Sequence, residues 1–373
     1  MSHPAAEQTI LLDEHRYVAH PHMAVLPDGT WLLVVNRAPR RVVTMHPPQD
    51  PEFTNVLMRS HDEGATWTAP VVVPSYGATG TECAGLTVLP DGAVVLNQWQ
   101  FGWFSPDDRE AAAREPDYCP PEVLKAGLLG STEIGSGLIA DMPAARLMPW
   151  ARGGGITLVH RSEDAGRTFP TVSVVRTAPY SGGYGMRGAV VLPDGEVLLP
   201  LSDIPRYERI FLVRSRDGGR SWGPPSPVAA VPGCEFEEPA PLLLATGEIL
   251  LLLRENASRT LFATRSADGG RSWSTPRPTG IGSYPAHLVG LPDGRIAAVT
   301  GRRHPPFGIE AYLSRDGGRS FDADRPATIR AGLPNKDLGY PTAALRRDGS
   351  LFVAYYYRNA SGVTGLHATS VTI

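Results

Sequence analysis

The chain has 373 residues, of which 42% are hydrophobic, and a formal net charge of −3. This length suits two ordinary domains or one large all-β domain, and either can bury a full core. The nearly balanced charge excludes a strongly basic surface for nucleic acid, and no apolar run of about 18 residues predicts a membrane span.

The first predicted element is a short strand at 9–13, TILLD, which has no obvious neighbour in the sequence. After it, apolar runs divided by Asp-Gly or a close variant recur along the chain. Asp-Gly between two such runs predicts a β-hairpin, because the tight turn needs a positive φ that glycine adopts readily. Six hairpins are predicted, at 25–35, 88–96, 191–199, 243–253, 291–299 and 345–356.

A second repeat, Ser-x-Asp-x-Gly-x-x-Trp/Phe, follows five of these hairpins. In this octet the Asp can accept hydrogen bonds from turn amides, Gly supplies the left-handed position, and the aromatic ring packs back between strands. We interpret the octets as structural turns with no part in chemistry. They lie at 60–67, 162–169, 215–222, 266–273 and 314–321.

The two repeats keep a nearly constant spacing of 23 residues from Asp194 to Asp217 and 22 from Thr246 to Asp268. Each unit therefore has four short antiparallel strands, and six units predict an all-β, six-bladed β-propeller forming a single domain over 1–373. The second unit carries an insertion at about 100–155 between its second and third strands. The sixth unit lacks an octet, so we expect residues 9–13 to supply its fourth strand and close the ring.

The octets resemble the Asp boxes of the sialidase superfamily, and the resemblance covers essentially the whole chain. It implies an active site on the face opposite the boxes, with the insertion as a wall or lid. It also implies Tyr340 as nucleophile and Glu238, or its neighbour Glu237, as the base. A neutral Tyr avoids the repulsion that a carboxylate nucleophile would meet beside a substrate carboxylate.

The same resemblance implies Asp50, with Glu52 as the alternative, as acid/base, and arginines that bind the substrate carboxylate. Arg254 fits one arginine position, and strand parity favours Arg303 over Arg302 for another. The third position normally lies in an Arg-Ile-Pro motif, where this chain has YVAHPHM instead, with His20 or His22 in the place of the arginine and Arg37 as a compensating cation. Strand register points further side chains to this face: Glu82, Arg187, Asp203, Tyr284, His287 and Tyr357.

The cysteines and the N-terminal residues indicate which cofactors and which cellular location to expect. Cys83, Cys119 and Cys234 are too few for a disulfide framework and show no metal-binding spacing. The first residues carry an early acid and no apolar run of signal-peptide length. We therefore expect a cytoplasmic protein with no metal, no cofactor, and no membrane or nucleic-acid partner.

Carbohydrate is the expected substrate, and three functions remain open. The first is a glycoside hydrolase that acts on an acidic sugar of ulosonic or uronic type. The second is a propeller rhamnosidase or polysaccharide lyase, in which His22 or His287 and a Tyr serve as acid and base on a uronate-containing glycan. The third is a carbohydrate-binding propeller without turnover.

Overall fold

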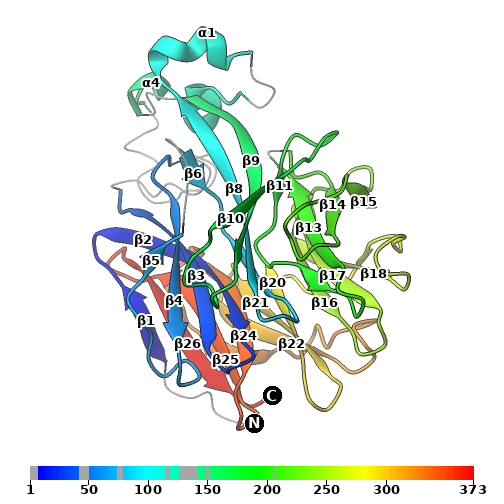
Figure 1. Cartoon of the computed structure of the whole chain (residues 1–373). Coiled ribbons are helices and arrows are strands. Elements are labelled where there is room, and N and C mark those ends of the chain that lie inside the picture. The colour runs from blue at the N-terminus through cyan, green and yellow to red at the C-terminus, as the bar shows by residue number, and fades with distance from the viewer. Residues whose placement is uncertain are drawn as a thin grey trace.

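The computed structural model describes residues 7–41, 50–73, 79–114, 118–125, 141–147, 151–204 and 206–373. These residues form six antiparallel sheets, the blades, arranged about a common axis (Figure 1). The predicted all-β, six-bladed propeller is confirmed. Innermost strand first, blade one has β2 (Arg16–Val25), β3 (Trp31–Pro39), β4 (Thr54–Ser60) and β5 (Val71–Val72).

In blades two and three the innermost strand is broken in two. Blade two has β6 (Thr79–Thr81), β7 (Gly85–Val88), β8 (Val94–Phe104), β9 (Ala151–Ser162) and β10 (Thr171–Val175). Blade three has β11 (Gly183–Tyr184), β12 (Val190–Val191), β13 (Val197–Asp203), β14 (Ile210–Ser215) and β15 (Ser226–Ala229).

In the remaining blades the innermost strand is continuous. Blade four has β16 (Phe236–Leu243), β17 (Ile249–Glu255), β18 (Thr260–Ser266) and β19 (Arg277–Pro278). Blade five has β20 (Ala286–Gly290), β21 (Ile296–Arg302), β22 (Gly308–Ser314) and β23 (Ala327–Ala331). Blade six has β24 (Leu338–Leu345), β25 (Leu351–Arg358), β26 (Thr364–Val371) and β1 (Gln8–Leu12).

The core lies between neighbouring blades, which explains the continuous apolar runs of the sequence. In β17, Leu251 and Leu253 pack against blade three, whereas Leu250 and Leu252 pack against blade five. All four side chains are at most 1% exposed. A strand covered on both faces needs apolar residues at every position rather than at alternate ones.

The octets connect the third and fourth strands, at the same end of each blade as the Asp-Gly turns. In 215–222 the Ser215 hydroxyl donates to Asp217 Oδ1 at 2.7 Å and accepts the Gly219 N–H at 2.7 Å. The same carboxylate accepts the Ser221 N–H at 2.9 Å. Trp222 packs on the apolar layer between blades two and three. These bonds all lie within one turn.

Asp217→Ala is expected to lower stability and leave activity per folded molecule unchanged. The substitution removes the acceptor for the Ser221 amide, which should lower the unfolding free energy by about 1 kcal/mol at this surface turn. Urea denaturation followed by an assay at equal folded concentration checks both points. A large loss of activity at unchanged stability would contradict the structural interpretation of the octets.

The ring is closed by the N-terminal strand, as the sequence predicted. β1 pairs antiparallel with β26, placing Gln8 opposite Ala368 and Leu12 opposite Gly365. Glu7, just before β1, accepts hydrogen bonds from Tyr355 at 2.9 Å and from Arg330 at 2.7 Å. The described start and end of the chain therefore lie together, at the octet end of the propeller (Figure 1).

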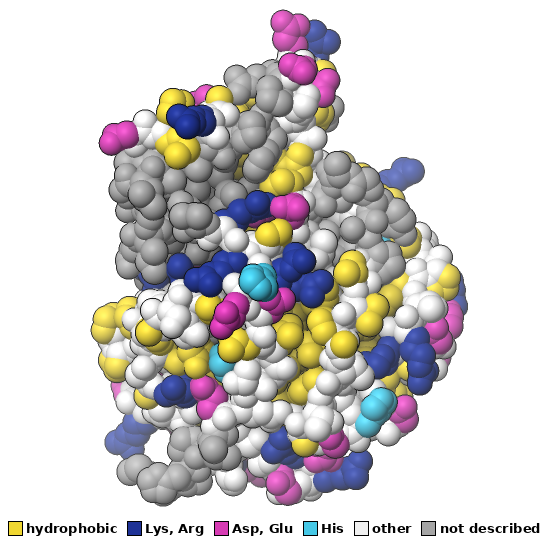
Figure 2. All heavy atoms as spheres, turned by 90° about the vertical axis from the view of Figure 1, so that its left-hand side faces the viewer, with side chains coloured by type: hydrophobic (Ala, Val, Ile, Leu, Met, Phe, Trp, Pro, Cys, Tyr) yellow, Lys and Arg dark blue, Asp and Glu magenta, His cyan; other side chains and the backbone are white. Residues whose placement is uncertain are grey.

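The insertion of blade two rises from the opposite end, because it joins the second and third strands, β8 and β9. Its described part contains a 3-10 turn, Pro106–Asp108, and the short helices α1 (Arg109–Ala112) and α4 (Ala144–Leu147). These elements project beyond the body of the propeller (Figures 1 and 2). The rest of the predicted insertion, 115–117, 126–140 and 148–150, lies outside the described residues. In the part of the chain that is described, no helix is long and apolar enough to cross a membrane.

Candidate functional site

Three inner strands share an unusual feature at the end that carries the insertion. β2, β16 and β24 each contain a β-bulge made of one residue and the proline that follows it. The residue before the proline has a positive φ in each case: 57° at His20, 53° at Glu238 and 46° at Tyr340. Non-glycine residues in this conformation are strained, and such strain is concentrated at functional sites.

The bulges of β16 and β24 bring Glu238 and Tyr340 together from different blades. The Tyr340 hydroxyl donates a short hydrogen bond to Glu238 Oε1. Tyr340 is 8% exposed and Glu238 is 3% exposed. Burial raises the pKa of Tyr340 well above its usual value, and the negative charge of Glu238 raises it further, while Arg303 and Arg254 oppose the shift. A phenol in this state needs a base to become a nucleophile, and Glu238 is in contact with its proton.

Arg254, from the end of β17, lies against both glutamates of the β16 bulge. Its Nη1 donates to Glu238 Oε2 at 3.1 Å, and its Nε lies 3.0 Å from Glu237 Oε1. In a regular strand adjacent side chains point to opposite faces, so the bulge explains why both carboxylates reach one arginine. The guanidinium carbon also lies 4.6 Å from the ring centre of Tyr284, which covers it as a cation–π partner.

Arg303 and His20 complete this side of the site. Arg303 Nε donates to the Leu338 carbonyl at 3.0 Å, and its guanidinium carbon lies 5.0 Å from the Tyr340 ring centre. The His20 ring meets Tyr340 edge-on at 4.2 Å and Tyr356 at 5.2 Å. His20 therefore occupies the blade-one position equivalent to Glu238 and Tyr340, whereas His22 does not.

Glu82 brings a third buried carboxyl group from blade two, and it is 4% exposed. Burial raises its pKa to about 8, and the Glu238 and Glu237 charges add to the rise while Arg152 opposes it. Arg152 stands at the foot of the insertion, opposite Trp103 of β8. The pKa of Tyr207, which also has a positive φ of 54°, is likewise raised by burial and by these carboxylates.

Arg152, Tyr207 and Tyr356 were not predicted from the sequence. Tyr356 packs against His20. Arg152 acts on Glu82 from the start of β9, beside a shift in the β8–β9 register, and Glu82 acts on Tyr207 in the loop between β13 and β14. Counting residues from the hairpin turns does not predict which side chains reach the site from such places. For the three bulges, the sequence did hold a signal, which is a residue followed by proline. This dipeptide occurs at equivalent places as His20-Pro21, Glu238-Pro239 and Tyr340-Pro341.

His22, His287 and Arg187 lie at the axis and connect blades. His22 Nδ1 accepts the Leu86 N–H at 3.0 Å, and His287 Nδ1 accepts the Ala343 N–H at 3.0 Å. Arg187 Nε donates to the Ala286 carbonyl at 2.9 Å, and burial lowers the pKa of Arg187 to about 10. An imidazole nitrogen that accepts a backbone N–H is unprotonated, so both histidines are held neutral.

Acidification is expected to destabilise the fold through these histidines. Burial lowers the pKa of His287 to about 3 and that of His22 well below 6.5, the value usual for an unfolded chain. Below pH 6.5 the unfolded chain therefore binds more protons than the folded one. Stability is full above this pH and falls as the pH drops toward the folded pKa, by about 1.4 kcal/mol per pH unit for each histidine.

Urea denaturation at about pH 7 and about pH 4.5 measures the loss. His287→Asn is the matched variant, because the Asn Oδ1 can accept the Ala343 N–H but does not titrate. This variant should lose less stability than the wild type on acidification. An equal loss in the two proteins would show that His287 contributes nothing to the pH dependence.

The other predicted residues lie apart from these contacts. Asp50 is 1% exposed and receives two bonds from Arg41, Nε to Oδ2 at 2.7 Å and Nη2 to Oδ1 at 2.9 Å. Glu52 contacts the same guanidinium. The pKa of Arg37 is lowered by burial and by Arg16, and no charge of the Tyr340 site acts on it.

Arg302, the rejected alternative to Arg303, and two residues chosen by register, Tyr357 and Asp203, have their contacts elsewhere. Arg302 binds Glu310 Oε1 at 3.0 Å, which leaves Arg303 as the arginine of β21 at the site. The Tyr357 hydroxyl donates to Glu7 Oε1 at 3.0 Å, on the outer side of blade six. Burial raises the pKa of Asp203, and the positive charge of Arg209, on the loop before β14, opposes this rise.

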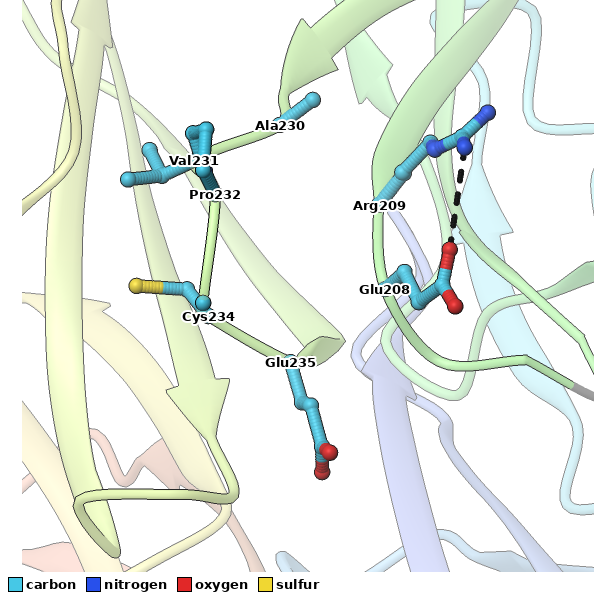
Figure 3. A pocket seen from close by; sticks show the side chains of 8 residues that line it. Glu208, Arg209, Ala230, Val231, Pro232, Cys234 and Glu235 are labelled. Atoms are coloured by element: carbon cyan, nitrogen blue, oxygen red, sulfur yellow. Dashed lines mark ion pairs between the residues drawn. The ribbon is translucent and has the colours of Figure 1, made fainter.

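A cavity of about 460 Å³ opens at the same end of the propeller, between the β13–β14 loop and the β15–β16 connection. Figure 3 shows the Glu208–Arg209 ion pair facing the segment from Ala230 to Glu235 across it. It contains none of the buried carboxylates. Among the described residues, no group of three or more His, Cys, Asp or Glu side chains could hold a metal ion.

Comparison with known proteins places this geometry in context. Residues 147–353 match the model of the BNR repeat-like domain. The chain is 27% identical over 340 residues to a sialidase of Micromonospora viridifaciens, covering 78% of this chain and 51% of that protein. It spans about half the length of the curated relatives it matches.

Two solved structures share the fold. A protein of unknown function from Dyadobacter fermentans superposes with a TM-score of 0.80 at 23% identity, covering 99% of this chain and 98% of its own. A leech intramolecular trans-sialidase superposes with a TM-score of 0.71 at 13% identity, covering 99% and 70%. At these identities the likeness concerns the fold alone.

Proposed function

Because the chain belongs to the BNR repeat-like family of the sialidase superfamily, we propose that it is a glycoside hydrolase whose nucleophile is Tyr340 and whose base is Glu238. The hydrogen bond between these two buried side chains carries the proposal. The Tyr340 oxygen bonds to the anomeric carbon as the bond to the leaving oxygen breaks, and the phenolic proton passes to Glu238. Water then releases the sugar in a second displacement, so the anomeric configuration is retained.

Protonation of the leaving group is assigned to Asp50, with Glu52 as the neighbouring alternative. Both carboxylates contact Arg41. An acid must reach the leaving oxygen of the substrate, and Arg41 donates a hydrogen bond to each oxygen of Asp50. The step therefore requires the Arg41 contact to open when the substrate binds.

The substrate we propose is an acidic sugar of ulosonic or uronic type, other than ordinary sialic acid. Arg254 and Arg303 both act on Tyr340 with their positive charge. Where a third arginine would complete the carboxylate site, His20 is packed between two tyrosines. An imidazole cannot reproduce the planar fork of a guanidinium, so a sialic acid carboxylate would be incompletely bound.

A screen of aryl glycosides of sialic, uronic and ulosonic acids, with rhamnose as the neutral member, tests the proposal. We expect release of the aryl group from an acidic sugar with retained configuration by proton NMR, and little or none from the sialic acid reporter. An unsaturated product absorbing in the ultraviolet would instead favour the lyase. Binding without turnover of any glycoside would favour the carbohydrate-binding propeller.

A further inference from the structure

Arg254 is the arginine nearest the reacting pair, yet it is already engaged by two carboxylates. Glu238 contacts Nη1 at 3.1 Å and Glu237 contacts Nε at 3.0 Å. Tyr284 covers one face of the guanidinium at 4.6 Å. The side chain is 19% exposed, so little of it remains open to a ligand.

The geometry of a guanidinium limits how a further carboxylate can bind. Each of its two forks uses Nη2 together with either Nε or Nη1. In Arg254, Nη1 donates to Glu238, and Nε, which has no hydrogen-bond partner, lies 3.0 Å from Glu237 Oε1. A substrate carboxylate that takes the Nε–Nη2 fork therefore meets the negative charge of Glu237 at the same place. Glu238 is also bonded to Tyr340, which leaves Glu237 as the group that can give way.

We propose that Glu237 determines specificity at this site: its carboxylate holds the place on Arg254 that the carboxylate of an acidic sugar would take. The inference rests on the proposed acidic-sugar site and adds that the substrate carboxylate has to displace Glu237 from Arg254. A sugar without a carboxylate at this place meets no competitor, whereas an acidic sugar binds only as Glu237 gives up its contact.

The charges around Glu237 make this competition depend on pH. Arg254 and Arg303 attract its carboxylate, Glu238 and Glu82 repel it, and Asn256 and Tyr207 also face it. Burial raises the pKa of Glu237, and Glu238 adds to the rise. Glu237 is therefore protonated more readily than an exposed glutamate. An acidic sugar should bind with the uptake of one proton.

Glu237→Gln tests the inference, because it keeps the shape of the side chain and one acceptor oxygen but removes the charge. Isothermal titration calorimetry with glucuronic acid and sialic acid, each against its methyl ester, isolates the effect of the carboxylate. In the wild type the acids should bind more weakly at pH 8 than at pH 6, by at most about tenfold per pH unit, as expected for the uptake of one proton. The variant should bind the acids at pH 8 as tightly as the wild type does at pH 6, with unchanged affinity for the esters.

Glu235→Gln is the control, since it removes the same charge two residues away at the exposed rim. It should behave as the wild type. Acids that bind wild type and Glu237→Gln equally at both pH values would overturn the inference and leave the proposed sugar site standing. Failure of every acid and ester to bind either protein would overturn both. The expected binding pattern without turnover of any glycoside would support the inference and count against the hydrolase.

Discussion

Tyr340→Phe is expected to abolish hydrolysis of the true substrate, with a loss of about a thousandfold or more in kcat. The substitution removes the oxygen that bonds the anomeric carbon and the proton that Glu238 accepts. The ring remains, so the edge contact with His20 at 4.2 Å and the contact with Arg303 at 5.0 Å are kept. Substrate affinity should therefore change little. Turnover of the best glycoside from the screen and calorimetric binding of that glycoside measure the two quantities.

Tyr355→Phe is the matched control on the neighbouring strand. Its hydroxyl bonds Thr369 and Glu7 on the outer side of blade six, away from the pocket. This variant should hydrolyse the glycoside at the wild-type rate. Full activity in Tyr340→Phe would remove the nucleophile assignment and favour chemistry based on other groups of the pocket.

The second large effect is expected at the propeller axis, in Gly188→Ala. Gly188 has a φ of +71°, and an added Cβ would lie 2.3 Å from the Leu86 carbonyl oxygen and 2.7 Å from Thr87 Oγ1. Leu86 cannot move freely, because its N–H is bonded to His22. Strain in the left-handed region and overpacking together should lower the unfolding free energy by about 3 kcal/mol or more.

Gly195→Ala separates the two causes. Gly195 has a φ of +85°, but an added Cβ would find nothing within 4 Å. Only the backbone strain remains at this position, so the unfolding free energy should fall by about 1–2 kcal/mol. Chemical denaturation of both variants gives the comparison. Equal decreases in unfolding free energy would mean that the residues around Gly188 shift to make room for the added methyl group.

The fold could be predicted because its signals are local and repeated. Asp-Gly turns and octets each encode one turn, and their constant spacing sets the length of a blade. The position of residues 9–13 followed from the unpaired edge of the last blade, and the pairing of β1 with β26 confirms it. The broken inner strands of blades two and three were not predicted, because irregular backbone leaves no periodic pattern.

The site was partly predictable. Counting from the hairpin turns placed Glu238, Tyr340 and Arg254 at one end, and the structure brings these three side chains together. The same count, eight residues before Asp28, falls on His20 rather than His22, and the bulge of β2 contains His20. A bulge adds one residue to a strand and shifts every side chain before it to the other face, and this shift is invisible to hairpin spacing.

The pairing of β1 with β26 also has a consequence for how the molecule folds. The two strands join Gln8 to Ala368, so this contact closes a loop of nearly the whole chain. Closing a long loop carries an entropy penalty that slows folding, since it must be met before the new contacts form. Until the two strands pair, β26 is an open edge that invites association with other chains. We therefore expect the blade that bears Tyr340 to be completed last.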